Sequence, residues 1–285
     1  MQSNDFIPEV VCIGFFCHDV HQDGYILGGT ASYASLLFQK LGKKTAVLTS
    51  VGGDFLFFNK FKKAGINIYN KLASKTTVFK NVYNEHNERI QFISSRALTL
   101  YQADIPISWK QVPLVKLCLI ADELDISILS AFPNAIVGAT IQGWLRQWNE
   151  QGKITPKSMN WEWLQYIDVV LFSEDDIIGF EDKLSLITEY VKVAVMTKGK
   201  DGAIVYYNKQ ATHFPAFPVT QIDPTGAGDV FATAFLYHYS THNEIDLAAA
   251  YAHSAASFVV EGLGVQLPSK VAVDKRFQKY RNLFF

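Results

Sequence analysis

The sequence predicts one α/β domain in which helices cover a mostly parallel sheet. The 285 residues are enough for one large domain with a sizeable core, and 49% hydrophobic with 19% charged residues is ordinary globular composition. Short apolar runs, typical of strands buried on both faces, alternate with segments of helical periodicity. Loops that contain glycine separate these segments, as in successive βαβ units.

This alternation begins near the N-terminus. Thr30 is placed to cap a helix, and Gly42 is placed to end it. The elements expected here are a strand at Glu9–Phe15, a helix at 30–41, a strand at Lys44–Thr49 and a helix that Gly65 ends.

The alternation breaks between about Thr76 and Ile105. Two β-rich runs, Thr77–Tyr83 and Arg89–Ile93, follow one another with only the turn Asn84–Asn87 between them. Because no helix separates them, they predict a hairpin and not a βαβ unit. The hairpin could extend the main sheet or belong to a second one.

After Pro106 the alternation resumes, with helical patterns between the strands. A strand at Ala216–Ile222 is expected to lead into a helix that opens near Ala227 and runs toward Ser240. The other elements expected are strands at Val115–Ala121, Ala135–Ile141, Asp168–Phe172 and Lys192–Thr197, a hairpin of Ala203–Tyr207 with Ala211–Phe214, and a helix at Asp246–Val260.

Composition and motifs exclude several classes of function. A net charge of −1 gives no electrostatic case for nucleic acid or an anionic membrane. Three scattered cysteines fit a reducing cytosol, and no apolar run approaches the ~20 residues of a membrane helix. The N-terminus lacks the regions of a signal peptide, so we expect a cytoplasmic protein. Dinucleotide-binding and P-loop motifs are absent from the sequence.

The stretch most indicative of chemistry is Asp223-Pro-Thr-Gly-Ala-Gly-Asp229. Gly226, Ala227 and Gly228 stand where a helix begins, and a helix N-terminus attracts anions through free N–H groups and its dipole. A carboxylate beside a phosphate site is repelled, unless Asp229 orients or deprotonates a hydroxyl that attacks the phosphate. The alternative is an aspartate that merely complements the helix dipole.

The same stretch closely resembles the signature of the ribokinase-like, or PfkB, family of carbohydrate kinases, and the resemblance extends from the first strand to Gly264. It implies transfer of the terminal phosphate of ATP to a hydroxyl, with Asp229 as catalytic base and Gly226, Ala227 and Gly228 as anion hole. It also implies a three-layer fold with a small β-sheet lid, built from strands within about 15–27 and 76–105. Because a helix N-terminus lowers a carboxylate's basicity, we expect Asp229 to be ionised at neutral pH.

The resemblance assigns an early aspartate and a Gly-Gly pair to the acceptor, here Asp19 and Gly28–Gly29. On their own these would be a turn aspartate and a helix-start pair. Many sugar kinases have Asn where this chain has Tyr33, which makes ribose a poorer candidate.

Donor and metal residues are implied in the same way. Thr197, Gly199 and Gly202 resemble the nucleotide loop, although such a loop is usually only a turn. Asp176 stands at a Glu position that helps to place Mg²⁺, and Ser173 replaces the family's Asn. The resemblance also places His253 beside adenine, with a simply packed histidine as the alternative. It places Asp223 and Thr225 at a monovalent cation such as K⁺.

Several stretches look most like inositol kinases, among them Thr76–Phe79, Ala103–Pro106 and Ile141–Arg146. Gln142 and Arg146, four residues apart, are expected on one helix face toward the acceptor, with Glu123 as a weaker candidate. An inositol-like cyclitol is therefore the expected acceptor. A sugar or nucleoside kinase, or a catalytically silent relative, are the alternatives. We expect a monomer or a homodimer formed through the lid.

Overall fold

The computed structural model describes residues 6–83, 85, 89–262 and 266–285. Its main sheet has nine strands in the order β15-β14-β13-β12-β9-β8-β1-β4-β5, and every pair from β13 to β5 is parallel. β14 and β15 continue the sheet as an antiparallel hairpin. The strands are β1 (Val10–Gly14), β4 (Thr45–Gly52), β5 (Asn67–Ala73), β8 (Leu114–Cys118), β9 (Ile136–Thr140), β12 (Val169–Ser173), β13 (Val193–Thr197), β14 (Ala203–Tyr207) and β15 (Gln210–Phe214).

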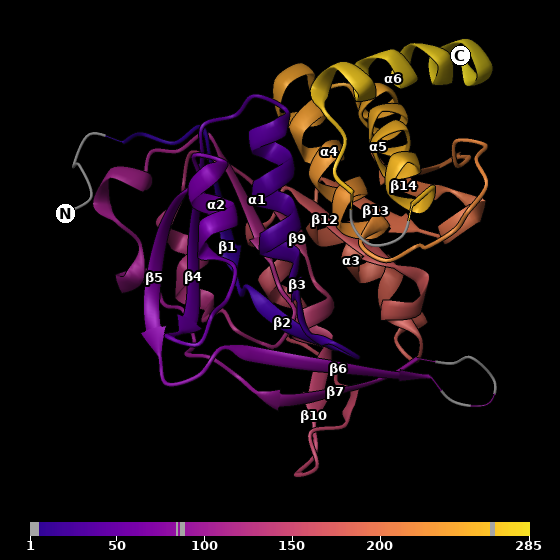
Figure 1. The fold of residues 1–285 in the computed structure, drawn as a ribbon. Helices are drawn as coiled ribbons and strands as arrows, with labels where there is room; N and C mark the ends of the chain where they lie inside the picture. Colours follow the sequence, from indigo (N-terminus) through magenta and orange to yellow (C-terminus); the bar gives the residue numbers. More distant parts are fainter. Residues whose placement is uncertain (1–5, 84, 86–88, 263–265) are drawn as a thin grey trace.

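Helices cover both faces of this sheet, but unequally. One face carries α1 (Thr30–Lys40), α2 (Phe58–Lys63), α4 (Ala227–His242) and α5 (Ile245–Val260), which share one apolar core. α6 (Lys270–Phe284) packs outside α5 (Figure 1). The second core, on the other face, contains α3 (Leu184–Tyr190) and short 3-10 turns. The helical patterns expected between the later strands are therefore mostly 3-10 turns, of three to six residues.

A second sheet has the order β3-β2-β6-β7, with strands β2 (Cys17–His21), β3 (Gly24–Gly28), β6 (Thr77–Tyr83) and β7 (Arg89–Ser95). β6 and β7 pair antiparallel, which confirms the predicted hairpin. Figure 1 shows them beneath the arrowheads of β4 and β5, at the carboxyl ends of the main strands. Residues 84, 86 and 87 of the predicted turn lie outside the described residues.

The expected strand at Ala216–Ile222 is absent from the structure, which has irregular chain there. Pro215 and Pro218 have no N–H to donate to a ladder, so they disfavour a paired strand. Ile222 instead donates its N–H to the carbonyl of Val260 (2.6 Å). The chain thus reaches α4 through a segment tied to the end of α5.

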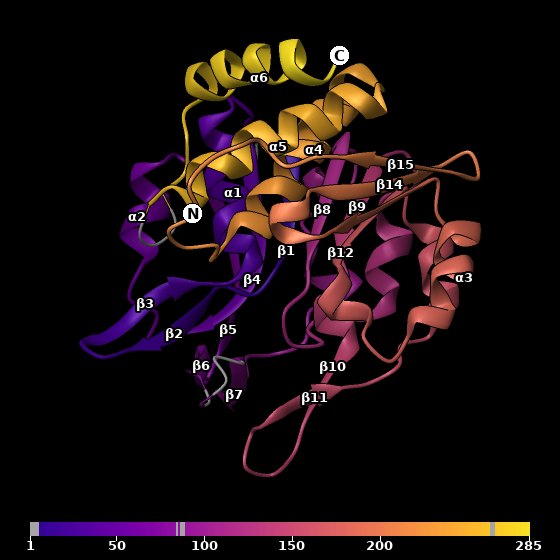
Figure 2. The ribbon, with the colours of Figure 1, turned by 90° about the vertical axis from the view of Figure 1, so that its right-hand side faces the viewer.

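Three features had no counterpart in the expectations, of which the first is the C-terminal helix α6. β5 adds an edge strand beside β4. β10 (Arg146–Trp148) and β11 (Ile154–Pro156) form a small hairpin, which Figure 2 shows extending away from the main sheet. Phe92 of β7 bridges to Lys153, so the hairpin lies against the second sheet. Within the described ranges no helix is long and apolar enough to cross a membrane.

Candidate active site

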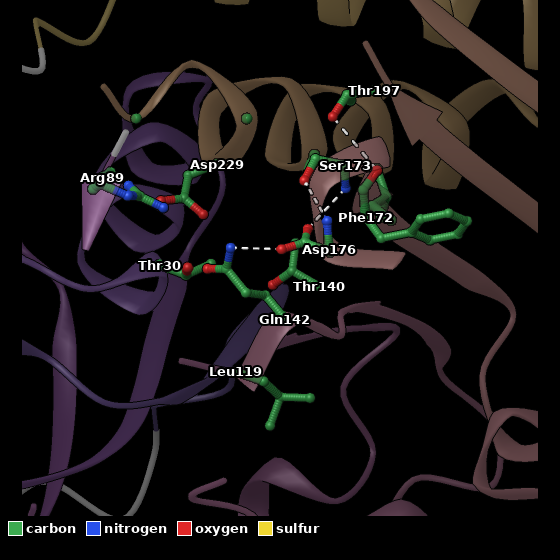
Figure 3. A pocket seen from close by; sticks show the side chains of 14 residues that line it. Thr30, Arg89, Leu119, Thr140, Gln142, Phe172, Ser173, Asp176, Thr197 and Asp229 are labelled. Carbon is green, nitrogen blue, oxygen red and sulfur yellow. Dashed lines mark hydrogen bonds between the residues drawn. The ribbon is translucent and has the colours of Figure 1, made fainter. Parts of the chain in front are cut away.

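A cavity of about 220 Å³ lies at the carboxyl ends of the central parallel strands (Figure 3). This is the edge at which ligands bind in open α/β sheets. Segments from both sheets and from α1 and α4 contribute to its wall. The lining residues are Thr30, Arg89, Leu119, Thr140, Gln142, Leu171, Phe172, Ser173, Asp176, Thr197, Gly226, Gly228, Asp229 and Ala232.

The N-terminus of α4 forms one wall of the cavity. Gly226 adopts φ 80° as the residue before the helix, a left-handed conformation that favours glycine. A Cβ on Gly228 would meet nothing within 4 Å, so the backbone there is open. Ala227 differs from both glycines, because its N–H donates to the carbonyl of Pro224 (3.1 Å). Of the three expected anion-hole residues, Gly226 and Gly228 line the cavity and Ala227 does not.

Asp229 lies in the first turn of α4, and the Thr30 side chain of α1 lines the same cavity. Gly29, at φ 93°, precedes α1, so Thr30 is its first helical residue and not the cap that we expected. Burial raises the pKa of Asp229, and the Thr30 side chain and the charges of Lys116 and Arg146 act to lower it. We expected the helix N-terminus to lower the basicity of Asp229, but its pKa lies above the ordinary aspartate value because burial is the largest influence on it. Its ionisation at neutral pH stays a prediction. The carboxylate is a stronger base than an exposed aspartate.

Asp176 faces Asp229 from across the cavity (Figure 3). Gln142 donates its Nε2–H to Oδ1 of Asp176 (2.7 Å), and the Ser173 N–H donates to Oδ2 (2.8 Å). Ser173 in turn accepts the Asp176 N–H, which closes a capping box at the end of β12. Each oxygen of Asp176 keeps lone-pair capacity toward the cavity.

The described residues contain no cluster of three or more histidine, cysteine or acidic side chains that could enclose a metal. One or two carboxylates suit Mg²⁺, which keeps several waters and is completed by substrate phosphates. Asp176 on the cavity wall fits that requirement. The monovalent-cation expectation stays a prediction: Oδ1 of Asp223 accepts the Thr225 N–H (2.9 Å), and Gly264 lies outside the described residues.

The second sheet brings Asp19 to the same region. A Cβ on Gly28 would lie 2.3 Å from Oδ2 of Asp19, so only glycine lets that carboxylate occupy its position. A Cβ on Gly29 would lie 2.5 Å from the carbonyl oxygen of Phe15. Burial raises the pKa of Asp19 to about 6, against the lowering effects of a Cys17 hydrogen bond and of Arg89.

Glu123 and Arg146 differ from what the sequence suggested. Glu123 is fully buried and outside the cavity lining; its carboxylate accepts backbone N–H groups of Phe15, Ile120 and Ala121, at 2.6–3.3 Å. Gln142 lies in a 3-10 turn (Gln142–Leu145) and Arg146 begins β10, so the shared helix face is wrong. Arg146 nevertheless acts electrostatically on Asp176 and Asp229, and burial lowers its pKa to about 10.

On the expected donor side, Thr197 lines the cavity at the end of β13 and donates to the Phe172 carbonyl (3.4 Å). The loop after it turns through Gly199 (φ 55°) and Gly202 (φ 93°). A Cβ on Gly202 would lie 2.1 Å from the Phe214 carbonyl oxygen, so the loop folds tightly onto β15. His253 is buried between the rings of Phe231 and Tyr280 and outside the cavity lining.

Several cavity residues were not among the expected site residues, and the polar ones are Thr30, Arg89 and Thr140, of which the last two belong to strands. Arg89 begins β7 and points into the cavity beside Asp229 (Figure 3), and Thr140 ends β9. Both stand at a strand end that faces the site. Their positions at strand ends were the available signal.

Comparisons with known proteins bear on the family and fold of this chain. The family model for pfkB family carbohydrate kinases matches residues 17–272. A nucleoside kinase of Methanothermobacter thermautotrophicus is 25% identical over 275 residues, which is 88% of this chain and 84% of that enzyme. The solved nucleoside kinase of Methanocaldococcus jannaschii, a member of the ribokinase family, superposes with a TM-score of 0.76 at 21% identity, covering 95% of this chain and 98% of that one.

Two further solved structures share the fold. A pyrophosphate-dependent kinase in complex with a pyrophosphate analogue and myo-inositol has a TM-score of 0.77 at 18% identity, covering 93% and 99% of the two chains. A fructokinase of Xylella fastidiosa with bound ATP has a TM-score of 0.78 at 17% identity, covering 96% and 99%. This chain belongs to the pfkB family of carbohydrate kinases, phosphotransferases with a hydroxyl group as acceptor, and it has the ribokinase fold.

Proposed function

We propose that this protein transfers the γ-phosphate of ATP to a hydroxyl of a small cyclitol or sugar, with Asp229 as the base. The observation that carries the proposal is the position of Asp229 between the open amides of the α4 N-terminus and the lid residue Arg89. The free amides of a helix N-terminus are suited to bind the transferred phosphate. A lid residue is suited to contact the acceptor, which would bind on the opposite side of that phosphate.

In the proposed reaction, the acceptor hydroxyl donates a hydrogen bond to Asp229 and attacks the γ-phosphorus in line. The new O–P bond forms, the bond from that phosphorus to the β-phosphate oxygen breaks, and the hydroxyl proton passes to Asp229. The N–H groups of Gly226 and Gly228 stabilise the charge on the transferring group. Arg89, at the start of β7, adds a positive charge on the lid side of the cavity.

Mg²⁺ bound with the phosphates would neutralise their charge, and Asp176 is the residue that we assign to it, acting through water. Gln142 and Ser173 hold the Asp176 carboxylate toward the cavity. Thr197 and Gly199 are placed to contact the donor phosphates. The second sheet would close over the acceptor and exclude water.

An inositol-like cyclitol is our preferred acceptor, because Tyr33 replaces the asparagine typical of ribose kinases and hydrogen-bonds through its OH to the Leu27 carbonyl (2.8 Å). Asp19 would accept hydrogen bonds from the acceptor's hydroxyl groups. A nucleoside is the second candidate, because relatives that match most of this chain's length are nucleoside kinases.

The test is a product assay over two donors and four classes of acceptor. Purified protein is incubated with ATP or pyrophosphate and with inositols, ribose, fructose or nucleosides, and the phosphorylated acceptor is identified by mass spectrometry. We expect the highest kcat/KM with ATP and an inositol. Turnover of nucleosides alone would overturn the cyclitol assignment, and turnover with pyrophosphate alone would overturn the donor.

A further inference from the structure

Lys116 is a fully buried cation in the middle of β8, and the reaction described above does not use it. Its Nζ has no hydrogen-bond partner among the described residues. No carboxylate of the described chain forms an ion pair with it within 4.0 Å. An ammonium group enclosed in this way is unfavourable unless a negative charge nearby compensates it.

The register of the sheet shows on which face Lys116 lies. Side chains alternate along a strand, and Leu114 and Cys118, two residues before and after Lys116, belong to the core beneath α1 and α4. Lys116 pairs with Gly138 of β9, where an added Cβ would lie 2.3 Å from the Leu236 side chain of α4. The Lys116 side chain therefore lies in the layer between β8 and the two helices.

Asp229 is the acidic residue in the N-terminal turn of α4, and Thr30 at the start of α1 lines the same cavity. The positive charge of Lys116 acts to lower the pKa of Asp229, against the effect of burial. Other charged or titratable groups also face Asp229 from the elements around it. They are Cys17 and Asp19 of β2, Tyr33 of α1, Arg89 of β7, Cys118 of β8, Arg146 of β10 and Asp176 after β12.

We propose that Lys116 is a positioning residue whose enclosed ammonium is the fixed counter-charge that keeps Asp229 a carboxylate inside the site. The proposal rests on the assignment of Asp229 as the base. Lys116 is suited to this role because it is built into the central sheet and cannot leave with the lid. Arg89, which belongs to the lid, moves with it if the lid opens.

The first test uses Lys116→Met, which keeps a long side chain and removes the charge, with the exposed Lys63→Met of α2 as control. The kcat is measured against pH at saturating acceptor, so that Asp19 does not contribute through acceptor binding. Without the cation the pKa of Asp229 rises, so the acidic limb of kcat moves to higher pH by about one unit. A limb that stays at the wild-type pH, as it should in Lys63→Met, would overturn the proposal.

The second test needs no turnover. Tm is measured for Lys116→Met, Asp229→Asn and the double variant. If the two charges compensate each other, each single variant leaves one buried charge without its partner, and the double variant melts about 3 °C above the additive expectation. Additive Tm values would overturn the charge pairing even if the protein is an active kinase. Non-additive values would support the pairing even if the proposed reaction fails.

Discussion

The two walls of the cavity are built in different ways. One wall is the start of α1 and α4, 11- and 16-residue helices packed on a sheet whose central strands are buried on both faces. The opposite wall, the lid wall, is the second sheet of four short strands that we propose as a lid, and Arg89 of β7 lines the cavity from it. The 3-10 turns after β9 and β12, which carry Gln142 and Asp176, join the two walls. The first wall carries Asp229, our proposed base, and the amides of Gly226 and Gly228, and the second carries Asp19 and Arg89. We infer that changes to the first wall alter the chemical step and changes to the second alter acceptor binding.

The largest expected effect is on the first wall. Asp229→Asn keeps the shape of the side chain but removes the proposed base, so kcat should fall by about 10³-fold while ATP affinity changes little. The measurement is kcat and, separately, ATP binding by calorimetry.

Asp246→Asn is the matched control, because Asp246 also lies in the first turn of a helix, α5. Removing a carboxylate that only complements a helix dipole costs about 0.3–1 kcal/mol of stability and leaves kcat unchanged. Equal and small effects of both variants would mean that Asp229 too serves the dipole, and the distinction between the walls would fail.

The same difference between the walls explains what could be predicted from the sequence. Periodicity and glycine placement located α1, α4, α5 and most central strands, because burial on two faces leaves a strong apolar pattern. The 3-10 turns around Gln142 and Asp176 are too short to show a hydrophobic periodicity that distinguishes them from α-helices, so the sequence predicted helices there. Pro215 and Pro218 disfavour the strand expected at Ala216–Ile222. Both are visible in the sequence, but the prediction gave more weight to the apolar residues of that stretch.

Site residues divide in a similar way. Asp229 belongs to a short sequence motif and Asp176 follows the end of a strand, so the sequence alone indicated both. Both line the cavity. Glu123 follows a strand as Asp176 does, but its carboxylate turns back onto three backbone N–H groups. The path of the loop after the strand decides whether such a carboxylate lines the cavity or accepts hydrogen bonds from the backbone. Lys116, a charge inside an apolar run, was visible in the sequence, but its neighbour Asp229 is 113 positions away in the numbering.

A smaller effect is expected where the two walls meet. Asp176→Asn weakens one acceptor for water on Mg²⁺, so the Mg²⁺ concentration for half-maximal rate should rise roughly tenfold. Asp175→Asn, at the exposed neighbouring position, is the control and should leave that concentration unchanged. If both variants shift the Mg²⁺ dependence equally, Glu174, Asp175 and Asp176 act only through their summed negative charge, and Asp176 has no particular role.

On the lid wall, Gly28→Ala should act on binding. Its Cβ would lie 2.3 Å from the Asp19 carboxylate and would displace it, so acceptor KM should rise about tenfold with a smaller change in kcat. Gly53→Ala is the matched control, since a Cβ there meets nothing within 4 Å. A kcat loss without a KM change in Gly28→Ala would contradict the division of roles between the walls.

The smallest expected effect is a pH dependence that belongs to the lid wall alone. Burial raises the pKa of Asp19 to about 6, so the carboxylate is present above that pH and is lost as pH falls through it. A protonated carboxyl still offers a donor and an acceptor to a polyol, so acceptor KM at pH 5 should be only about threefold higher than at pH 7.5. Asp19→Asn carries no titratable proton, so its KM should be flat over that range and close to the wild-type value at pH 5. A wild-type KM that does not change between pH 5 and 7.5, or an equal rise in Asp19→Asn, would separate Asp19 from acceptor binding and leave the lid wall without its proposed polar contact.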